Sequence, residues 1–133
     1  MIKDAQKLTC QCGCGYDTIS AHTLHVLTDM AVEYEKRGGD VVILSGARCK
    51  KHNDTVGGSK TSNHLKGWAI DFTCTRDDRL DQNALDEFSS VWIFDSFEGE
   101  YGAEVLRYDT FVHIALRPDR PAVFRNMRRR KNI

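Results

Sequence analysis

The chain has 133 residues, of which 41% are hydrophobic and 29% charged, a composition that indicates one soluble globular domain and excludes wholesale disorder. No apolar run approaches the ~20 residues of a membrane-spanning helix, and a formal net charge of zero argues against a strongly basic nucleic-acid-binding protein. The first segment, residues 8–16, carries three alternating cysteines and two glycines, which is typical of a compact turn.

A helix and a strand follow this segment. Residues 20–37 place apolar side chains at helical spacing behind Ser20, which we expect to be the N-cap, and a pair of glycines ends the helix. The β-branched run 41–44 then predicts a buried strand. Residues 46–63 are polar and contain glycine, so we expect a long loop, and long loops in compact domains are usually functional.

The second half of the chain predicts mostly short strands. A strand over 68–72 precedes a helix over 78–90, and three more strands are expected at 91–94, 103–107 and 111–116. This order is typical of an α+β fold in which helices pack on a small, largely antiparallel sheet. We expect one domain over 1–124 and a flexible basic tail over 125–133.

Histidine and aspartate in the pattern S-x-H-x-x-G-x-A-x-D, over residues 62–71, suggest a metal site, because both side chains are zinc ligands. In a straight strand His64 and Asp71 would lie ~23 Å apart. One ion binds both only if the chain doubles back, most easily at Gly67. Strand alternation puts His113 on the face opposite Val112. That pattern alone favours a core histidine with a satisfied hydrogen bond.

Four ordered motifs together resemble the zinc D-Ala-D-Ala carboxypeptidase family. They are Ser45–Cys49, Asn53 with Val56–Gly58, Ser62–Asp71 and Phe111–His113. That family includes cell-wall carboxypeptidases, D-Ala-D-Ala dipeptidases and phage L-alanyl-D-glutamate endolysins, and its fold resembles the Hedgehog signalling domain. The resemblance runs from about Cys10 to Leu116, and the C-x-C-G-C opening is similar to one branch of the family.

The resemblance implies roles for five residues. His64, Asp71 and His113 match the three zinc ligands, and three protein ligands leave a fourth position for water. Arg48 matches an arginine that binds substrate or stabilises the developing oxyanion, and its alternative is a structural salt bridge. Ser62 matches a serine beside the site that contacts substrate, and its alternative is a loop hydroxyl that caps a turn.

The general base departs from the family pattern. Relatives place an acid three residues before the last histidine, where this chain has Thr110, or two residues after it, where this chain has Ala115. Asp109 is the nearest carboxylate and our first candidate for the base. It lies ~13 Å from His113 along a straight strand, so a bend at Thr110 would be needed. Alternative bases precede it: Glu98, Glu100 and Glu104.

Five cysteines cannot all pair with one another, and the start of the chain has no apolar signal region. We therefore expect synthesis in the cytosol, where thiols stay reduced. Buried free thiols are the default interpretation. The alternative is a second, structural zinc site formed by the cysteines of the first segment with one further cysteine: Cys10, Cys12 and Cys14 with Cys49 or Cys74.

The resemblance implies a monomeric zinc metallopeptidase that cuts peptidoglycan stem peptides at bonds involving D-amino acids. Without an export signal it resembles a phage lysis or virion enzyme that acts on the cell wall. The rival from another class is a zinc-bearing binding module without a working base.

The basic end of the chain supports a weaker, third interpretation. Residues 117–133 carry seven basic residues and one acid, a net charge of +6. This excess suits contact with anionic wall polymers, and it is the one feature that would favour a nucleic-acid partner.

Overall fold

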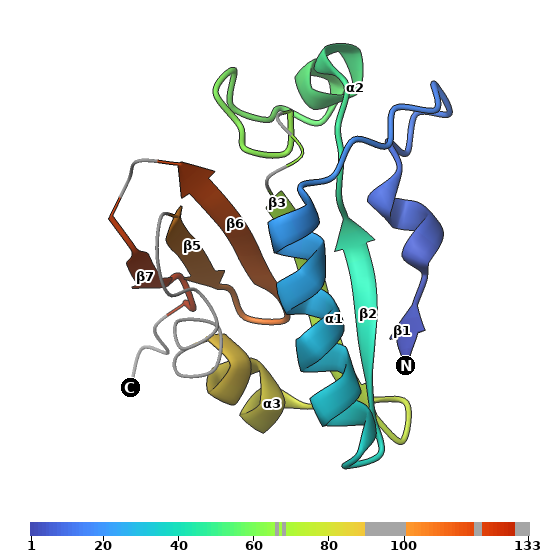
Figure 1. The fold of residues 1–133 in the computed structure, drawn as a ribbon, viewed down its shortest axis with the longest axis vertical. Coiled ribbons are helices and arrows are strands. Elements are labelled where there is room, and N and C mark those ends of the chain that lie inside the picture. The colour runs from blue at the N-terminus through green and yellow to red at the C-terminus, as the bar shows by residue number, and fades with distance from the viewer. Residues whose placement is uncertain (66, 68, 90–100, 119–120, 130–133) are drawn as a thin grey trace.

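The computed structural model describes every residue except 66, 68, 90–100, 119–120 and 130–133 (Figure 1). Its elements, in chain order, are β1 (Ile2–Lys3), η1 (Ala5–Leu8), α1 (Ala21–Glu35), β2 (Gly39–Ser45), α2 (Lys50–Thr55), β3 (Ala69–Arg76), β4 (Arg79–Leu80), α3 (Gln82–Glu87), β5 (Tyr101–Arg107), β6 (Val112–Pro118) and β7 (Val123–Asn126). The expected α+β class is confirmed.

Within the described residues, the strands form one seven-stranded sheet. Its order is β1-β2-β3-β6-β5-β7, and β4 pairs with β3 outside this path. The pairs β2–β3, β3–β6 and β5–β6 are antiparallel, whereas β1 and β7 add to the sheet in parallel. The strands β3 and β6, which carry two of the expected zinc ligands, are thus neighbours near the middle of the sheet.

The core lies between the helices and one face of this sheet. Helix α1 buries Leu27, Met30, Ala31 and Tyr34, which recur at helical spacing, and these side chains belong to one core cluster with α3 and the strands. Figure 1 shows α1 lying across the sheet with α3 near its lower end. The predicted helix and strands therefore form two layers around a single hydrophobic core.

Strand alternation then fixes which face carries the polar residues. Ile70 and Phe72 of β3 and Ile114 of β6 are fully buried in the core cluster. Because neighbouring residues on a strand point to opposite faces, Asp71 and His113 face away from the core helices. The expectation that His113 opposes its neighbours Val112 and Ile114 agrees with this arrangement.

Two sequence expectations about the first half of the chain differ from the structure. The expected loop 46–63 contains the short helix α2. Ser20 precedes α1 as expected, but its side chain makes no capping hydrogen bond. The strand expected at 91–94 lies outside the described residues.

The start of the expected flexible tail is part of the sheet. Arg125 lies opposite Leu106 in the β5–β7 pair, and the Met127 amide donates to the Arg107 carbonyl at 2.7 Å. Arg128 forms an ion pair with Asp86 at 3.0 Å. The physical reason is that β7 pairs with the backbone of β5, which would otherwise be a sheet edge. The sheet therefore includes residues 125 and 126, which the sequence analysis assigned to the tail.

None of the helices in the described part of the chain has the length and apolar character needed to cross a membrane.

Candidate metal centre and substrate groove

His64, Asp71 and His113 come together in the structure. One ligand atom from each residue lies within 4.8 Å of the other two. Asp71 and His113 are directly opposite each other in the β3–β6 pair, and His113 Nδ1 is 2.8 Å from Asp71 Oδ1. His64 arrives from the preceding loop, with Nε2 3.3 Å from Asp71 Oδ2. Strand pairing thus brings together Asp71 and His113, which are 42 positions apart, and a turn brings His64 to them.

The turn that brings His64 back depends on Gly67. This residue has a φ of 70°, and a Cβ at its position would lie 2.1 Å from the Thr18 carbonyl oxygen. Its amide donates to the His64 carbonyl, and its own carbonyl accepts from the Ser20 amide at 2.6 Å. The expected bend is therefore a left-handed turn packed against the segment before α1.

A carbonyl group orients the buried His64 ring. Nδ1 lies 2.7 Å from the Gly46 carbonyl oxygen, and since a carbonyl can only accept, Nδ1 must carry the proton. In the neutral ring, Nε2 then presents its lone pair toward Asp71. Metal-binding histidines are oriented in this way, with the second nitrogen donating to a carbonyl or carboxylate.

Both ring nitrogens of His113 face carboxylates. Nδ1 faces Asp71, and Nε2 lies 3.1 Å from Glu104 Oε1. Burial alone would lower the pKa of His113, but the hydrogen bonds to these two carboxylates outweigh it and raise the pKa to about 9. Burial would raise the pKa of Asp71, but the hydrogen bond that it accepts from His113 holds the pKa well below the usual range. The group therefore stabilises positive charge between its members.

Glu104 was only an alternative in the sequence analysis, yet it reaches this group. It lies on β5 directly opposite Ala115 of β6, diagonal to His113, and long side chains span such diagonals. Asn63 Nδ2 also donates to Glu104 Oε1, at 3.3 Å. The carboxylate therefore reaches the group from β5, the strand next to β6.

Asp109, the first candidate base, is not brought to this group. It lies in the tight β5–β6 turn, which the Tyr108 amide closes by donating to the Phe111 carbonyl. The Asp109 carboxylate accepts the Arg129 amide at 2.9 Å, and its carbonyl accepts from Gln82. The turn directs residue 109 away from the ligands, so the bend toward the metal that its role required does not occur. Glu98 and Glu100 lie outside the described residues.

Arg48 is held beside the group by neutral partners. Its backbone amide donates to the His64 carbonyl at 3.1 Å, and its guanidinium donates to Asn53 Oδ1 at 3.1 Å and to Ser45 Oγ at 3.5 Å. Asn53 is fully buried and also donates to the Ser59 carbonyl. Among the described residues Arg48 has no carboxylate partner, so the salt-bridge alternative finds no support there.

Ser62 caps the turn that leads into His64. Its hydroxyl oxygen accepts the His64 amide at 3.2 Å, and its carbonyl accepts the Leu65 amide. This is the capping role that the sequence left open. Contact between Ser62 and a substrate stays a prediction.

A groove of about 760 Å³ opens beside this loop. Its lining includes three cationic side chains and one acid, together with Tyr16 and Leu65: Arg48, Lys50, Lys60 and Asp54. Leu65 directly follows His64 in the chain. The groove therefore adjoins the loop that carries His64, and its cationic side chains suit a ligand with carboxylate groups.

Comparison with protein families decides the identity. A model of the family described as peptidase M15 matches residues 4–115, which include all three members of the group and Glu104. The chain belongs to the peptidase M15 family. In comparisons with curated proteins and with solved structures, no significant match is found. The M15 assignment confirms the resemblance stated from the four motifs.

The donor set of this M15 domain fits zinc. Two donors at about 2.1 Å in a tetrahedron lie about 3.4 Å apart, close to the 3.3 Å between His64 Nε2 and Asp71 Oδ2. A deprotonated imidazole nitrogen and a carboxylate oxygen at this distance repel each other unless a proton or a cation lies between them. Nitrogen and carboxylate oxygen are both ligands that Zn²⁺ accepts.

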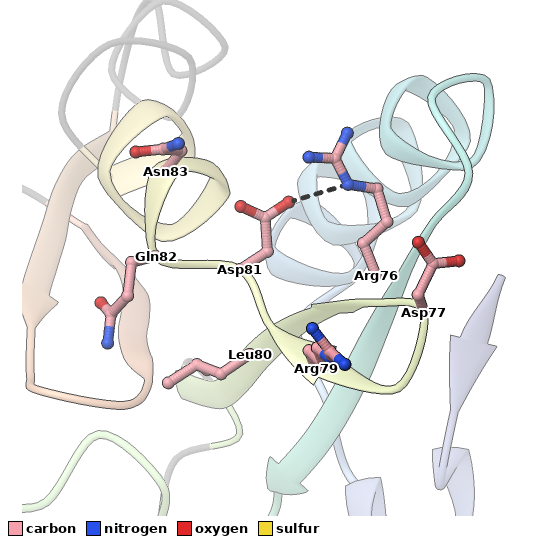
Figure 2. Close-up of a pocket in the computed structure, with 7 residues that line it drawn as sticks. All are labelled: Arg76, Asp77, Arg79, Leu80, Asp81, Gln82 and Asn83. Atoms are coloured by element: carbon pink, nitrogen blue, oxygen red, sulfur yellow. Dashed lines mark ion pairs between the residues drawn. The ribbon is translucent and has the colours of Figure 1, made fainter.

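A second hollow, of about 620 Å³, lies at the far end of β3 from Asp71 (Figure 2). Seven residues of the β3–β4 turn and the start of α3 line it: Arg76, Asp77, Arg79, Leu80, Asp81, Gln82 and Asn83. Figure 2 shows Arg76 and Asp81 turned toward each other, with Arg76 Nε 3.7 Å from Asp81 Oδ2. None of these residues belongs to a group of metal-binding side chains in the described part of the chain.

Proposed function

We propose that this M15 peptidase is zinc-dependent and hydrolyses peptidoglycan stem peptides at bonds involving D-amino acids. The observation that carries the proposal is the meeting of His64, Asp71 and His113 on one face of the sheet, with the Glu104 carboxylate against His113. A peptidase whose nucleophile is water needs a metal or a general base to activate that water, and this group offers residues for both roles.

In the proposed mechanism, His64, Asp71 and His113 would hold the metal. Bound zinc would lower the pKa of a water molecule and polarise the scissile carbonyl. The Glu104 carboxylate would accept the proton of the attacking water and return it to the leaving amine. Gly46 and Glu104 keep the two imidazole rings oriented through hydrogen bonds to their second nitrogens.

Arg48 positions the substrate. Its guanidinium lines the cationic groove and would hold a substrate carboxylate in two-point contact, or the oxyanion that develops on the scissile carbonyl. Stem peptides carry free carboxylates on D-glutamate and at their C-terminus, which suits a groove with Lys50 and Lys60. This charge match supports a cell-wall peptide as the substrate.

The binding-module alternative depended on the missing acids at positions 110 and 115. Glu104, which lies opposite Ala115 on the neighbouring strand, brings a carboxylate to His113 in their place. We therefore favour the enzyme over the binding module.

Digestion of purified muropeptides, with products identified by mass, tests the proposal. Wild-type protein supplied with zinc should release either D-alanine or a free stem peptide, and the product names the bond. His64→Ala should release neither. His25→Ala is the matched control, because His25 lies on the exposed surface of α1 beside Asp29 and should leave activity unchanged. Metal-loaded wild type that cleaves no muropeptide would favour the binding module instead.

A further inference from the structure

Four of the five cysteines come together at one end of the molecule, outside the peptidase centre. One sulfur from each of Cys10, Cys12, Cys14 and Cys49 lies within 4.8 Å of the other three. Cys12 Sγ is 3.5 Å from Cys10 Sγ and 3.6 Å from Cys49 Sγ. Figure 1 shows the segment before α1, which carries the first three cysteines, at the same end as α2, which Cys49 precedes.

The sulfur spacing is that of a tetrahedral metal site. Four sulfurs at about 2.3 Å from one ion lie about 3.8 Å from each other, close to the 3.5 and 3.6 Å found here. A disulfide would require ~2.05 Å, and all five cysteines are free thiols. The fifth, Cys74, is buried in the core cluster between the sheet and the helices and takes no part.

The backbone holds these sulfurs in place. The Cys49 amide donates to Cys10 Sγ at 3.3 Å, and the His52 amide donates to Cys49 Sγ at 3.3 Å. Amide donors of this kind stabilise a thiolate over a thiol. The loop that carries Cys12 and Cys14 is closed by the Cys10 amide donating to the Tyr16 carbonyl at 2.6 Å. The cluster therefore forms from segments that the fold already orders.

Exposure and charge also suit a metal. Cys10 is buried and Cys49 half-buried, whereas Cys12 and Cys14 are exposed, so an ion can reach the cluster from solvent. Lys51 lines the hollow over these sulfurs and would offset the negative charge of four thiolates on a divalent ion. Soft sulfur ligands in a tetrahedron select zinc over hard cations such as magnesium or calcium.

We propose that Cys10, Cys12, Cys14 and Cys49 bind one structural Zn²⁺, separate from the His64–Asp71–His113 centre. Binding releases the thiol protons to solvent, and no electron is transferred. Four protein ligands leave no open position, so this ion stabilises structure and does not activate water.

This site would connect the N-terminal segment to the peptidase centre. Cys49 directly follows Arg48, and the Ala47 amide donates to the Leu8 carbonyl at 2.8 Å. Tyr16, which closes the cysteine loop, donates from its hydroxyl to the Leu65 carbonyl at 2.9 Å, next to His64. A metal in the cluster therefore holds together the loops that position the substrate-binding arginine and a zinc ligand.

Metal analysis of the full chain, purified under reducing conditions, tests the proposal independently of peptidase activity. Wild type should contain two zinc ions per chain, and both the Cys12→Ser/Cys14→Ser variant and His64→Ala should contain one. Combining the two sets of substitutions should leave none. Cys74→Ala is the matched control and should keep two. Zinc content that is the same in wild type and in the double cysteine variant would overturn the proposal.

Cobalt substitution gives a second readout that needs no cysteine variant. In His64→Ala, cobalt should produce the intense near-ultraviolet absorption of thiolate-to-metal charge transfer, and a chelator should remove this band and lower the Tm. Loss of the band in His64→Ala would overturn the proposal, as would intramolecular disulfides found by mass in freshly prepared wild type. Failure of muropeptide cleavage would bear on the peptidase proposal alone.

Discussion

Glu104 Oε1 lies 3.1 Å from His113 Nε2, although the two residues are on different strands and nine positions apart. The contact follows from strand register: Leu106 is directly opposite His113, so Glu104 is its diagonal neighbour on the same face. Ala115 and Ala69, in register beside Glu104, are small and fully buried. A carboxylate thus reaches the candidate metal centre from β5, whereas the sequence motifs directed attention to β6.

Replacing this carboxylate should separate chemistry from metal binding. We expect Glu104→Gln to lower kcat by about 10²- to 10⁴-fold, the usual contribution of a positioned base, while zinc at the His64 centre is retained. Muropeptide turnover and zinc content, measured on the same preparation, check this expectation. A variant that keeps its turnover would exclude Glu104 as the base, and one that loses zinc would make it a positioning residue for His113.

Asp109→Asn is the matched control for this experiment. The Asp109 carboxylate accepts the Arg129 amide, and an asparagine oxygen can accept the same bond. We therefore expect Asp109→Asn to keep wild-type turnover. A loss of turnover as large as that of Glu104→Gln would instead identify Asp109 as the base, as the sequence analysis first suggested.

Arg48 should discriminate between substrates by charge. Hydrogen bonds to a charged group contribute about 1.5–3 kcal/mol, so Arg48→Gln should lower kcat/KM for a peptide with free carboxylates by roughly 10- to 100-fold. The loss should shrink for the same peptide with amidated carboxylates, because that peptide cannot form the charge-assisted pair. Arg79→Gln removes an exposed charge at the far end of β3 and should change neither value. Equal losses on both peptides would assign Arg48 to the oxyanion instead.

The turn at Gly67 should be needed for stability and for metal binding. A Cβ there would meet the Thr18 carbonyl at 2.1 Å and would occupy a left-handed conformation. Gly38 has a similar φ of 77°, and a Cβ at that position would have nothing within 4 Å. Gly38→Ala therefore isolates the conformational cost, about 1–2 kcal/mol. Gly67→Ala should lower the free energy of unfolding further and reduce zinc occupancy. Equal destabilisation of the two variants in urea would show that the contact with Thr18 relaxes at no cost.

Sequence reasoning predicted the three residues that gather as the candidate metal centre, the central strands and α1, because periodicity and a dense motif carry that information locally. It named Glu104 only as one alternative base, since the approach of this side chain to His113 depends on the pairing of β5 with β6. It also favoured Asp109 as the base because this residue is close to His113 along the chain. In the structure Asp109 lies in a tight turn, so closeness along the chain does not bring its carboxylate to His113. The partner of the N-terminal cysteines was left open between Cys49 and Cys74 for the same reason: long-range contacts decide it. Residue 125 was assigned to a tail on its basic surroundings, because the pairing of β7 with β5 is a long-range contact.

Asp81 gives a prediction about pH that is independent of any metal. It precedes α3, where its side chain accepts the Ala84 amide at 3.1 Å, and its other oxygen accepts the Tyr34 hydroxyl at 2.7 Å. Burial would raise the pKa of Asp81, but these bonds and the nearby Arg76 outweigh it and lower the pKa from 3.8. A lowered folded-state pKa stabilises the protein above pH 3.8, and this contribution disappears as pH falls through the folded-state value.

Asp81→Asn should therefore unfold more easily at neutral pH, by about 1 kcal/mol. The variant keeps one oxygen, so it loses the charge together with one of the two accepted hydrogen bonds. The part of the difference from wild type that changes with pH reports the charge. Urea unfolding at a series of pH values measures it, and the difference should shrink steadily below pH 3.8. Asp77→Asn, in the same turn, is the control and should match wild type at every pH. A difference between wild type and Asp81→Asn that persists unchanged into acid would mean that the charge of Asp81 contributes nothing to the stability of the fold.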